Sequence, residues 1–213
     1  MKRQHGLSLV ELMVAILISS LLLLGVLQLF GNSTESDRTV NALARVQEGG
    51  HAILEIIGTD ARRAGYQGCS SIANKTTVGS VTFPDDALAA ATKSVTFRYA
   101  TREDTGTDFS ASNACDGAAL HLRAVTYAQC TNGTSLCMTL NGGSADPILD
   151  NAVLDSIFFG IPEGNATRWV ESANVSATQL ASAQAVRIQL TLNDARTGVT
   201  RTFSGTYELR NRI

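Results

Sequence analysis

An uninterrupted apolar run follows a short basic start at the beginning of the chain. Nearly every position of residues 7–30 is apolar, and Glu11 is the only charged residue in that run. At about 1.5 Å per residue a helix of this length spans about 36 Å, which exceeds the roughly 30 Å of a bilayer core. Lys2 and Arg3 precede the run. The positive-inside rule therefore places residues 1–6 in the cytoplasm and the rest of the chain on the other side of the membrane.

Beyond Phe30 the pattern becomes that of an amphipathic helix. Apolar or small residues recur every three or four positions, at Val40, Leu43, Val46, Gly50, Ile53, Ile57, Ala61 and Ala64. Charged residues take the opposite face, at Asp37, Arg38, Arg45, Glu48, Glu55 and Arg62. This periodicity predicts one helix from about residue 7 to residue 64, with a weak point at Gly49 and Gly50 and an end at Gly65. We expect residues 7–30 to lie in a membrane or filament core and residues 31–66 to pack under a globular head.

The rest of the chain, residues 67–213, has the two-residue alternation of β-strands. The predicted strands lie around residues 94–99, 120–123, 153–161, 186–192 and 203–209. Residues 193–198 are rich in turn formers, so the last two strands should form a hairpin. Since each strand has one apolar face, we expect an antiparallel sheet that the amphipathic helix covers. The fold class is therefore α+β.

Charge and cysteine content exclude some kinds of partner. The net charge is −2 and no basic cluster follows the first residues, which argues against nucleic acid as a partner. The four cysteines, Cys69, Cys115, Cys130 and Cys137, lack the C-x-x-C spacing of zinc sites. In an exported chain they indicate two disulfides, the alternative being four free thiols in a cytosolic protein. From their positions we expect Cys130–Cys137 and Cys69–Cys115, one of three possible connectivities.

Residues that could carry chemistry are few and scattered. His5, His51 and His121 have no metal-ligand spacing, and no phosphate-binding glycine loop is present. Asp85 and Asp86 are expected in a solvated turn, because a calcium site needs more oxygen ligands. Trp169 is expected as a partly buried core residue. We therefore expect no catalytic residue, no metal, no cofactor and no enzymatic activity.

The apolar run itself has three interpretations. A cleaved signal peptide has a shorter apolar core and a small-x-small cut site, which this run lacks. A plain signal anchor fits the length, but it does not explain Glu11. A charged side chain deep in a membrane costs about 2.5–3.5 kcal/mol on insertion scales, so such residues are usually functional.

The third interpretation accounts for both features. The segment Gly6-Leu7-Ser8-Leu9-Val10-Glu11-Leu12 resembles the prepilin peptidase site of type IV pilins and type II secretion pseudopilins. The resemblance implies cleavage between Gly6 and Leu7, N-methylation of the new amine of Leu7, and Glu11 as the fifth mature residue. Because the apolar run holds no basic residue to pair with Glu11, we expect its carboxylate to pair with the Leu7 amine of a neighbouring subunit in a filament. Leu7 stands where these families more often have Phe. The implied fold is pilin-like, with a long helix packed on an antiparallel sheet.

Further residues narrow the resemblance. The segment Ala44-Arg45-Val46-Gln47-Glu48 and the helix end Ala61-Arg62-Arg63-Ala64-Gly65-Tyr66-Gln67-Gly68-Cys69 look like those of the PilW group of minor pilins. The terminal Leu209-Arg210-Asn211-Arg212 loosely resembles their last strand. The match covers about the first seventy residues well, whereas the middle of the chain diverges.

This resemblance implies a low-abundance subunit that primes type IV pilus assembly near the tip, with roles in adhesion and twitching motility. The implied partners are other minor pilins, the major pilin, the prepilin peptidase and the inner-membrane assembly platform. The chain would lie in the inner membrane with its head in the periplasm and later in the pilus. A minor pseudopilin of a type II secretion system is the closest alternative. A membrane-anchored periplasmic enzyme or binding domain is the alternative from a different class.

Overall fold

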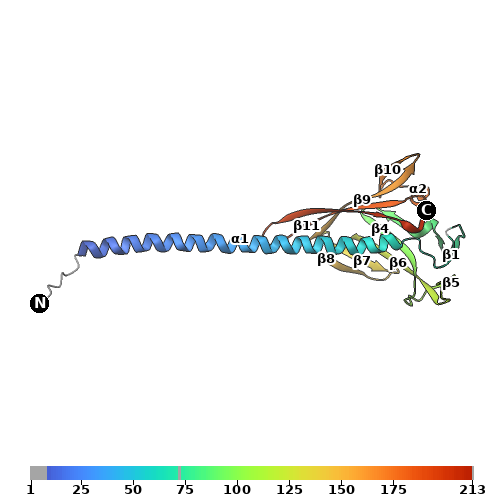
Figure 1. The fold of residues 1–213 in the computed structure, drawn as a ribbon, viewed down its shortest axis with the longest axis horizontal. Coiled ribbons are helices and arrows are strands. Elements are labelled where there is room, and N and C mark those ends of the chain that lie inside the picture. The colour runs from blue at the N-terminus through green and yellow to red at the C-terminus, as the bar shows by residue number, and fades with distance from the viewer. Residues whose placement is uncertain (1–8, 72, 213) are drawn as a thin grey trace. The chain divides into compact units, whose positions relative to one another are not determined.

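A computed structural model of the chain describes residues 9–71 and 73–212 (Figure 1). The chain divides into two compact units, residues 1–44 and residues 45–213. The described part of the first unit is helical and belongs to α1 (Leu9–Arg63), whose last residues are part of the second unit. Antiparallel β-sheets follow α1 in the second unit. The predicted α+β, pilin-like fold is therefore confirmed.

Helix α1 ends where the sequence predicts. Gly65 adopts a positive φ of 85°, a left-handed conformation that costs glycine little and terminates helices. The amide of Asn211, from the far end of the chain, donates to the carbonyls of Arg62 and Arg63 at 3.2 and 3.4 Å. Because the last carbonyls of a helix lack partners within the helix, Asn211 caps this end. Gly49 and Gly50 do not interrupt the helix.

The described residues of the second unit form three sheets. The four-stranded sheet has the order β10-β9-β11-β12, made of β9 (Ala152–Glu163), β10 (Ala166–Glu171), β11 (Ala185–Asn193) and β12 (Thr200–Glu208). The six-stranded sheet contains β3 (Leu88–Ala91), β4 (Ser94–Thr101), β6 (Ala119–Gln129), β7 (Ser135–Leu140) and β8 (Ala145–Asp150), with β5 (Asp108–Asn113) paired to β6. A small hairpin joins β1 (Thr76–Val78) to β2 (Val81–Phe83). The short helices are η1 (Asp85–Ala87), α2 (Ala177–Ala181) and η2 (Arg210–Arg212).

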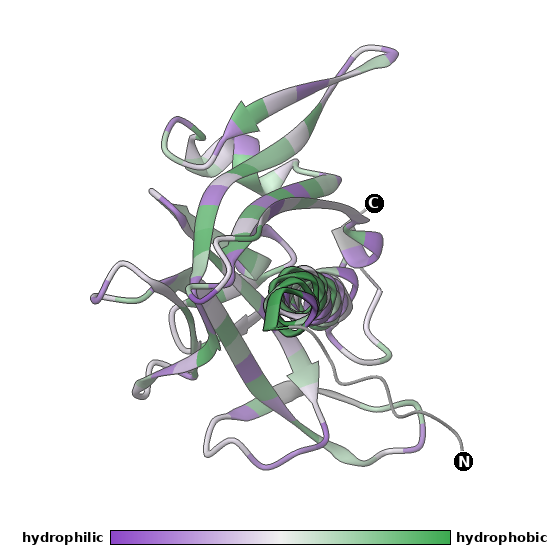
Figure 2. Cartoon of the chain, turned by 90° about the vertical axis from the view of Figure 1, so that its left-hand side faces the viewer, coloured by the Kyte–Doolittle hydropathy of each residue, from purple (hydrophilic) through white to green (hydrophobic). Residues whose placement is uncertain are grey.

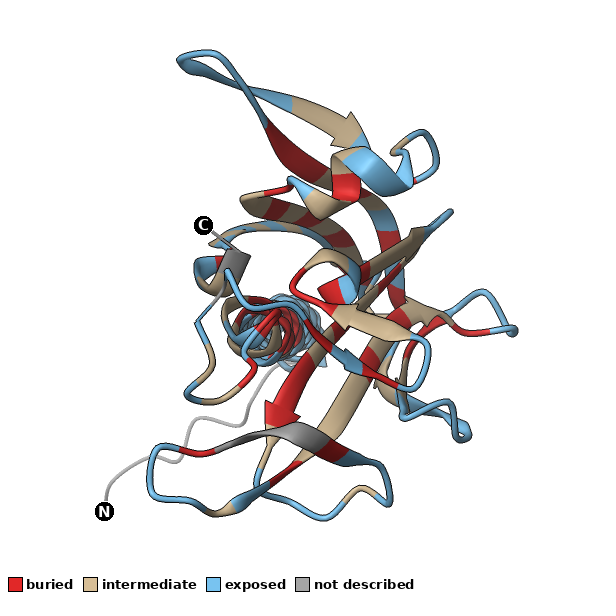
Figure 3. Cartoon of the chain, turned by 90° about the vertical axis from the view of Figure 1, so that its right-hand side faces the viewer, coloured by how far each residue is buried: buried red, intermediate tan, exposed pale blue. Residues whose placement is uncertain are grey.

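The main core lies where residues 45–63 of α1 meet both larger sheets. Val46, Ile53 and Ile57 of the helix belong to one buried cluster with side chains of β4, β6, β9 and β11. Along β4 and β11 buried and partly buried positions alternate, as the sequence pattern predicts (Figure 3). Val40 is exposed, so the buried stripe of the helix is shorter than the pattern predicted.

Two helix glycines make room for aromatic rings of β12. A Cβ atom on Gly50 would lie 2.5 Å from the ring of Phe203, and a Cβ on Gly58 would lie 2.4 Å from the ring of Tyr207. The hydroxyl of Tyr207 also donates to the carbonyl of Leu54 at 2.6 Å. Gly50, expected only as a weak point, is thus a contact site that a side chain would obstruct.

A smaller core and both disulfides lie outside this main cluster. Phe83 and Phe109 pack with their ring centroids 4.9 Å apart, together with Leu120 of β6. The disulfide Cys69–Cys115 closes a loop with a sequence separation of 46, and Cys130–Cys137 closes one of 7 across the β6–β7 turn. This pairing is the one expected from the sequence. By the chain-entropy relation loops of these lengths are worth about 4 and about 2 kcal/mol.

The predicted strands match β4, β6, β9, β11 and β12, and the β11–β12 hairpin pairs Asn193 with Thr200 as expected. The sequence pattern missed β1, β2, β3, β5, β7, β8 and β10. Most of these are short or lie at a sheet edge, where the alternation is brief or has only one paired neighbour.

A substitution at Gly58 tests whether the packing of the Tyr207 ring on the helix stabilises the head. Gly58→Ala should lower the free energy of unfolding by about 1–3 kcal/mol, because the new methyl group overlaps a ring that a hydrogen bond holds in place. The measurement is thermal or denaturant unfolding of the full chain in detergent micelles.

Gly49→Ala is the matched control. Its Cβ would meet side chains of Leu192 and Leu149 at 3.5 and 3.6 Å, which is ordinary van der Waals distance. This variant should be neutral or more stable by up to about 1 kcal/mol, since alanine favours the helix. Equal destabilisation by both substitutions would show that the ring contact is not what matters.

Candidate functional site

The apolar first part of α1 presents its side chains outward. The hydrophobic residues of positions 9–30 are exposed, and none of the most apolar stretch of the helix is buried inside the protein. Figure 2 shows these turns in green. The stretch has a mean hydropathy of 2.6, and α1 is the one described helix long and apolar enough to cross a membrane. Such a surface needs a lipid or protein environment to be removed from water.

Glu11 is the only charged residue of positions 9–34. It lies in the first turn of the described part of α1, and its side chain is exposed. Within the described residues the carboxylate of Glu11 has no hydrogen bond and no ion pair. An uncompensated carboxylate in an apolar surface is costly in a membrane, so a partner from outside this chain is its simplest source of stabilisation.

The other predicted residues of this site lie at the very start of the chain. Gly6 and Leu7, predicted to flank the cleaved bond, are outside the described residues. The predicted pairing of the Leu7 amine with Glu11 of a neighbouring chain therefore rests on their four-residue spacing in the sequence.

The scattered polar candidates have local structural partners. Asp85 forms an ion pair with Lys75, and Asp86 accepts a hydrogen bond from the backbone of Thr82 at 2.9 Å. His51 packs edge-on against Phe203, with ring centroids 5.5 Å apart. These contacts give Asp85, Asp86 and His51 structural roles, the first two beside the β1–β2 hairpin and the third against the core.

His121 and Trp169 lie on different sheets. Nδ1 of His121 is 3.1 Å from a carboxylate oxygen of Asp108. Trp169 is half-buried, and the guanidinium of Arg187 stacks 4.1 Å from its ring centroid. Over residues 9–71 and 73–212 no group of three histidine, cysteine or acidic side chains is arranged to hold a metal ion.

A polar cluster that sequence reasoning missed joins α1 to the six-stranded sheet. The carboxylate of Asp60 accepts hydrogen bonds from the hydroxyls of Tyr99 at 2.7 Å and Tyr127 at 2.6 Å. Both rings are buried in the main core. Tyr99 and Tyr127 lie on adjacent strands β4 and β6, so one helix carboxylate fixes two neighbouring strands. The helical period places Asp60 between the buried and charged faces, but only the fold brings the two tyrosines to it.

The cluster changes the ionisation of both phenols. Burial, reinforced by the hydrogen bond to Asp60, raises the pKa of Tyr99 to about 12. Burial and the same carboxylate also raise the pKa of Tyr127 well above its ordinary value. In both cases the neutral phenol is favoured, because a buried phenolate beside a carboxylate would be doubly unfavourable.

We predict that Asp60→Ala lowers the free energy of unfolding by about 2–4 kcal/mol, because it leaves two buried hydroxyls without their acceptor. Chemical denaturation of the full chain in micelles measures the change. Glu48→Ala is the control, since Glu48 is an exposed acid of the same helix, and it should stay within about 0.5 kcal/mol of the wild type. A loss no larger than that of the control would exclude a supporting role for Asp60.

The raised phenol pKa values predict a loss of stability in alkali. A group whose folded-state pKa is raised contributes stability that is complete below its ordinary pKa of about 10. This contribution falls as the pH rises through the folded value, which for Tyr99 is about 12. Unfolding free energy measured from pH 8 to 12 should therefore decline above about pH 10, and Tyr127→Phe should make the decline shallower. A decline of the same steepness in the variant would contradict this origin.

The start of the chain is similar to known proteins. Residues 1–27 match the family described as the prokaryotic N-terminal methylation motif. None of the curated proteins compared with the chain matches it. The motif and the exposed apolar helix that overlaps it support a type IV pilin- or pseudopilin-like protein that is membrane-associated, processed by a peptidase and assembled with other pilins.

Proposed function

We propose that this protein is a minor pilin of a type IV pilus, similar to the PilW group, which is incorporated near the filament tip and helps to start assembly. The observation that carries the proposal is Glu11, a lone carboxylate in an exposed apolar helix segment that lies within the methylation motif. A simple membrane anchor needs no such carboxylate. The protein acts by binding other subunits rather than by catalysis.

The mechanism begins with the removal of residues 1–6 in the cytoplasm. Cleavage leaves the apolar helix in the inner membrane and creates a cationic amine on Leu7, four residues before Glu11. Neighbouring helices in a filament are shifted along its axis. The amine of one subunit then meets the carboxylate of another inside an apolar bundle, where ionic attraction is least screened.

This pairing acts as a check on register. If a subunit docks with the wrong axial shift, both charges are buried without partners, which typically costs about 3–5 kcal/mol. Correct docking pairs both charges and covers the apolar surface in the same step. The head, held under the amphipathic part of α1, remains outside the membrane for contacts with other subunits.

The processing of the N-terminus is open to direct measurement. In native-host membranes the mature chain should begin at Leu7 and carry one methyl group on its amine, which intact-mass measurement detects. Gly6→Val should block cleavage, because the peptidase must accommodate a residue with almost no side chain there. A wild-type chain that begins near Asn32, or that stays uncleaved while the peptidase is present, would contradict the proposal.

Substitutions of Glu11 distinguish a filament subunit from an anchored domain. Glu11→Ala should leave insertion, cleavage and head folding intact but lower incorporation into sheared filaments by more than about tenfold, as the loss of a buried charge pair implies. Glu11→Asp should be partly defective, because its shorter side chain reaches less far. Counting this subunit in sheared pili by quantitative mass spectrometry gives the result.

Glu11→Gln keeps the size of the side chain and removes its charge. If this variant is incorporated as well as the wild type, the carboxylate is incidental and the charge-pairing mechanism is wrong. If the wild-type chain is found in secretion filaments instead of pili, the pseudopilin alternative replaces the pilus assignment.

A further inference from the structure

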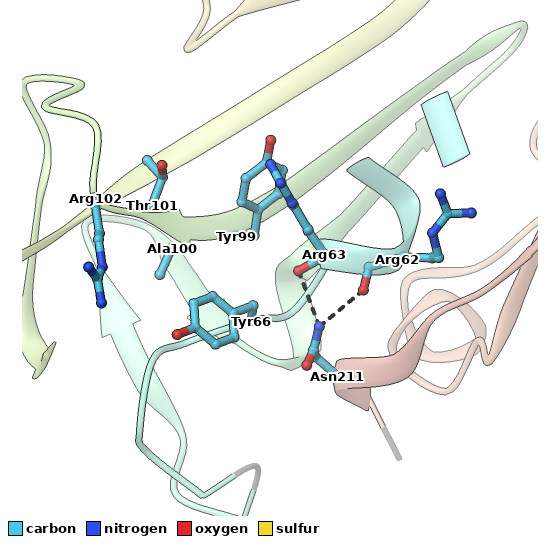
Figure 4. Close-up of a pocket in the computed structure, with 8 residues that line it drawn as sticks. All are labelled: Arg62, Arg63, Tyr66, Tyr99, Ala100, Thr101, Arg102 and Asn211. Carbon is cyan, nitrogen blue, oxygen red and sulfur yellow. Dashed lines mark hydrogen bonds between the residues drawn. The ribbon is translucent and has the colours of Figure 1, made fainter. Parts of the chain in front are cut away.

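An open hollow lies at the C-terminal end of α1, on the second unit (Figure 4). Its volume is about 450 Å³, and its lining includes Arg62, Arg63, Tyr66, Tyr99, Arg102 and Asn211. Three of these residues are arginines and none is acidic. Most come from the Arg-Arg-Ala-Gly-Tyr segment that ends the helix and from the end of β4.

The arginines differ in how far their charge is already compensated. Arg62 is paired with Glu55 at 2.8 Å, and its side chain points away from the hollow in Figure 4. Arg63 lies over the ring of Tyr99, 6.0 Å from its centroid, and its side chain also interacts with the hydroxyl of that residue. Arg63 has no ion pair within the described residues, and a neutral phenol does not cancel a positive charge, so the charge of Arg63 is available to a ligand.

Arg102 stands on the other side of the hollow (Figure 4). It is paired with Asp116 at 2.8 Å, but the two side chains are 66 and 53 % exposed. Exposed ion pairs contribute little to stability because water screens them, so this pair can open toward a better-shielded carboxylate.

Tyr66 supplies an aromatic side chain on a fixed backbone. Its amide donates to the carbonyl of Arg63 at 2.9 Å, and its carbonyl accepts from the amide of Ala100 at 2.7 Å. The residue nevertheless remains 37 % exposed. Tyrosine and arginine are the residue types that most often dominate the energy of protein–protein contacts.

The openness of the hollow indicates the kind of ligand. Small-molecule sites bury most of their ligand, whereas Arg63, Tyr66 and Arg102 are all exposed. A small anion here would stay in contact with water. A protein surface laid over the hollow would exclude that water and strengthen the pairing of a carboxylate with the planar guanidinium groups.

We infer that this hollow is a docking site for an acidic segment of a neighbouring filament subunit, with Arg63 and Arg102 binding its carboxylates and Tyr66 packing against it. The inference rests on the proposed function, since the partner is another subunit of the filament. It adds a contact made by the head to the one made by the apolar helix.

Photocrosslinking in native-host cells tests the contact directly. Tyr66 of the full-length chain is replaced by p-benzoylphenylalanine, the cells are irradiated, and adducts from sheared filaments are mapped by mass spectrometry. The expected adduct joins position 66 to a peptide of a different subunit that contains Asp or Glu. Arg63→Glu combined with Arg102→Glu should lower its yield about tenfold, since it replaces attraction by repulsion.

The matched control is Arg168→Glu. Arg168 lies on β10, is 52 % exposed and is paired with Glu163 at 3.3 Å, so it resembles Arg102 without lining the hollow. This control should leave the yield unchanged. Changing the acidic residue of the crosslinked peptide to arginine should restore the adduct in the double-glutamate background. If the double variant melts at a lower temperature, the Arg63→Gln and Arg102→Gln pair replaces it.

Three results would overturn the inference. They are an adduct yield that the charge changes leave unaffected, a crosslinked peptide without acidic residues, and no adduct although the chain is processed and present in filaments. Each of them leaves the proposed function standing. Absence of the wild-type chain from filaments would instead reject the proposed function itself.

Discussion

The structure depends on one constraint, which is that the chain cannot cover the apolar first part of its own long helix. Side chains of positions 9–30 face outward, and Glu11 lies among them without a partner in the described residues. A lipid bilayer can cover the apolar groups, but it cannot compensate the carboxylate. A bundle of similar helices can do both, and for this reason the filament proposal explains the segment more fully than a membrane anchor does.

In the second unit, the amphipathic part of the same helix packs against two sheets. Three kinds of contact hold it there: burial of apolar side chains, rings of β12 that pack on Gly50 and Gly58, and hydrogen bonds from Tyr99 and Tyr127 to Asp60. These contacts use glycine and a carboxylate where an ordinary core would have larger apolar groups. The head thus packs on α1 through contacts within one chain, whereas the apolar side chains of positions 9–30 have no cover in the described residues.

Much of this organisation follows from local pattern. The apolar run, the three- to four-residue period and the two-residue alternation predicted α1, its end at Gly65 and five of the strands, because each depends on neighbouring residues. The pattern did not predict the division into separate sheets, which depends on pairing between distant strands. It also missed Asp60, whose tyrosine partners are 39 and 67 residues away along the chain. Local pattern shows Gly50 only as a weak point of the helix, because the ring of Phe203 that packs on it comes from the other end of the sequence.

The central claim is that the carboxylate of Glu11 meets the terminal amine of a neighbouring chain. Treating sheared filaments with dicyclohexylcarbodiimide, which activates carboxyl groups in apolar surroundings, tests it without any substitution. The activated carboxyl group forms an amide only with an amine in direct contact. The account predicts a peptide that joins Glu11 to the N-terminal residue of another subunit. Modified Glu11 with no such crosslink, in filaments that contain the chain, would contradict it.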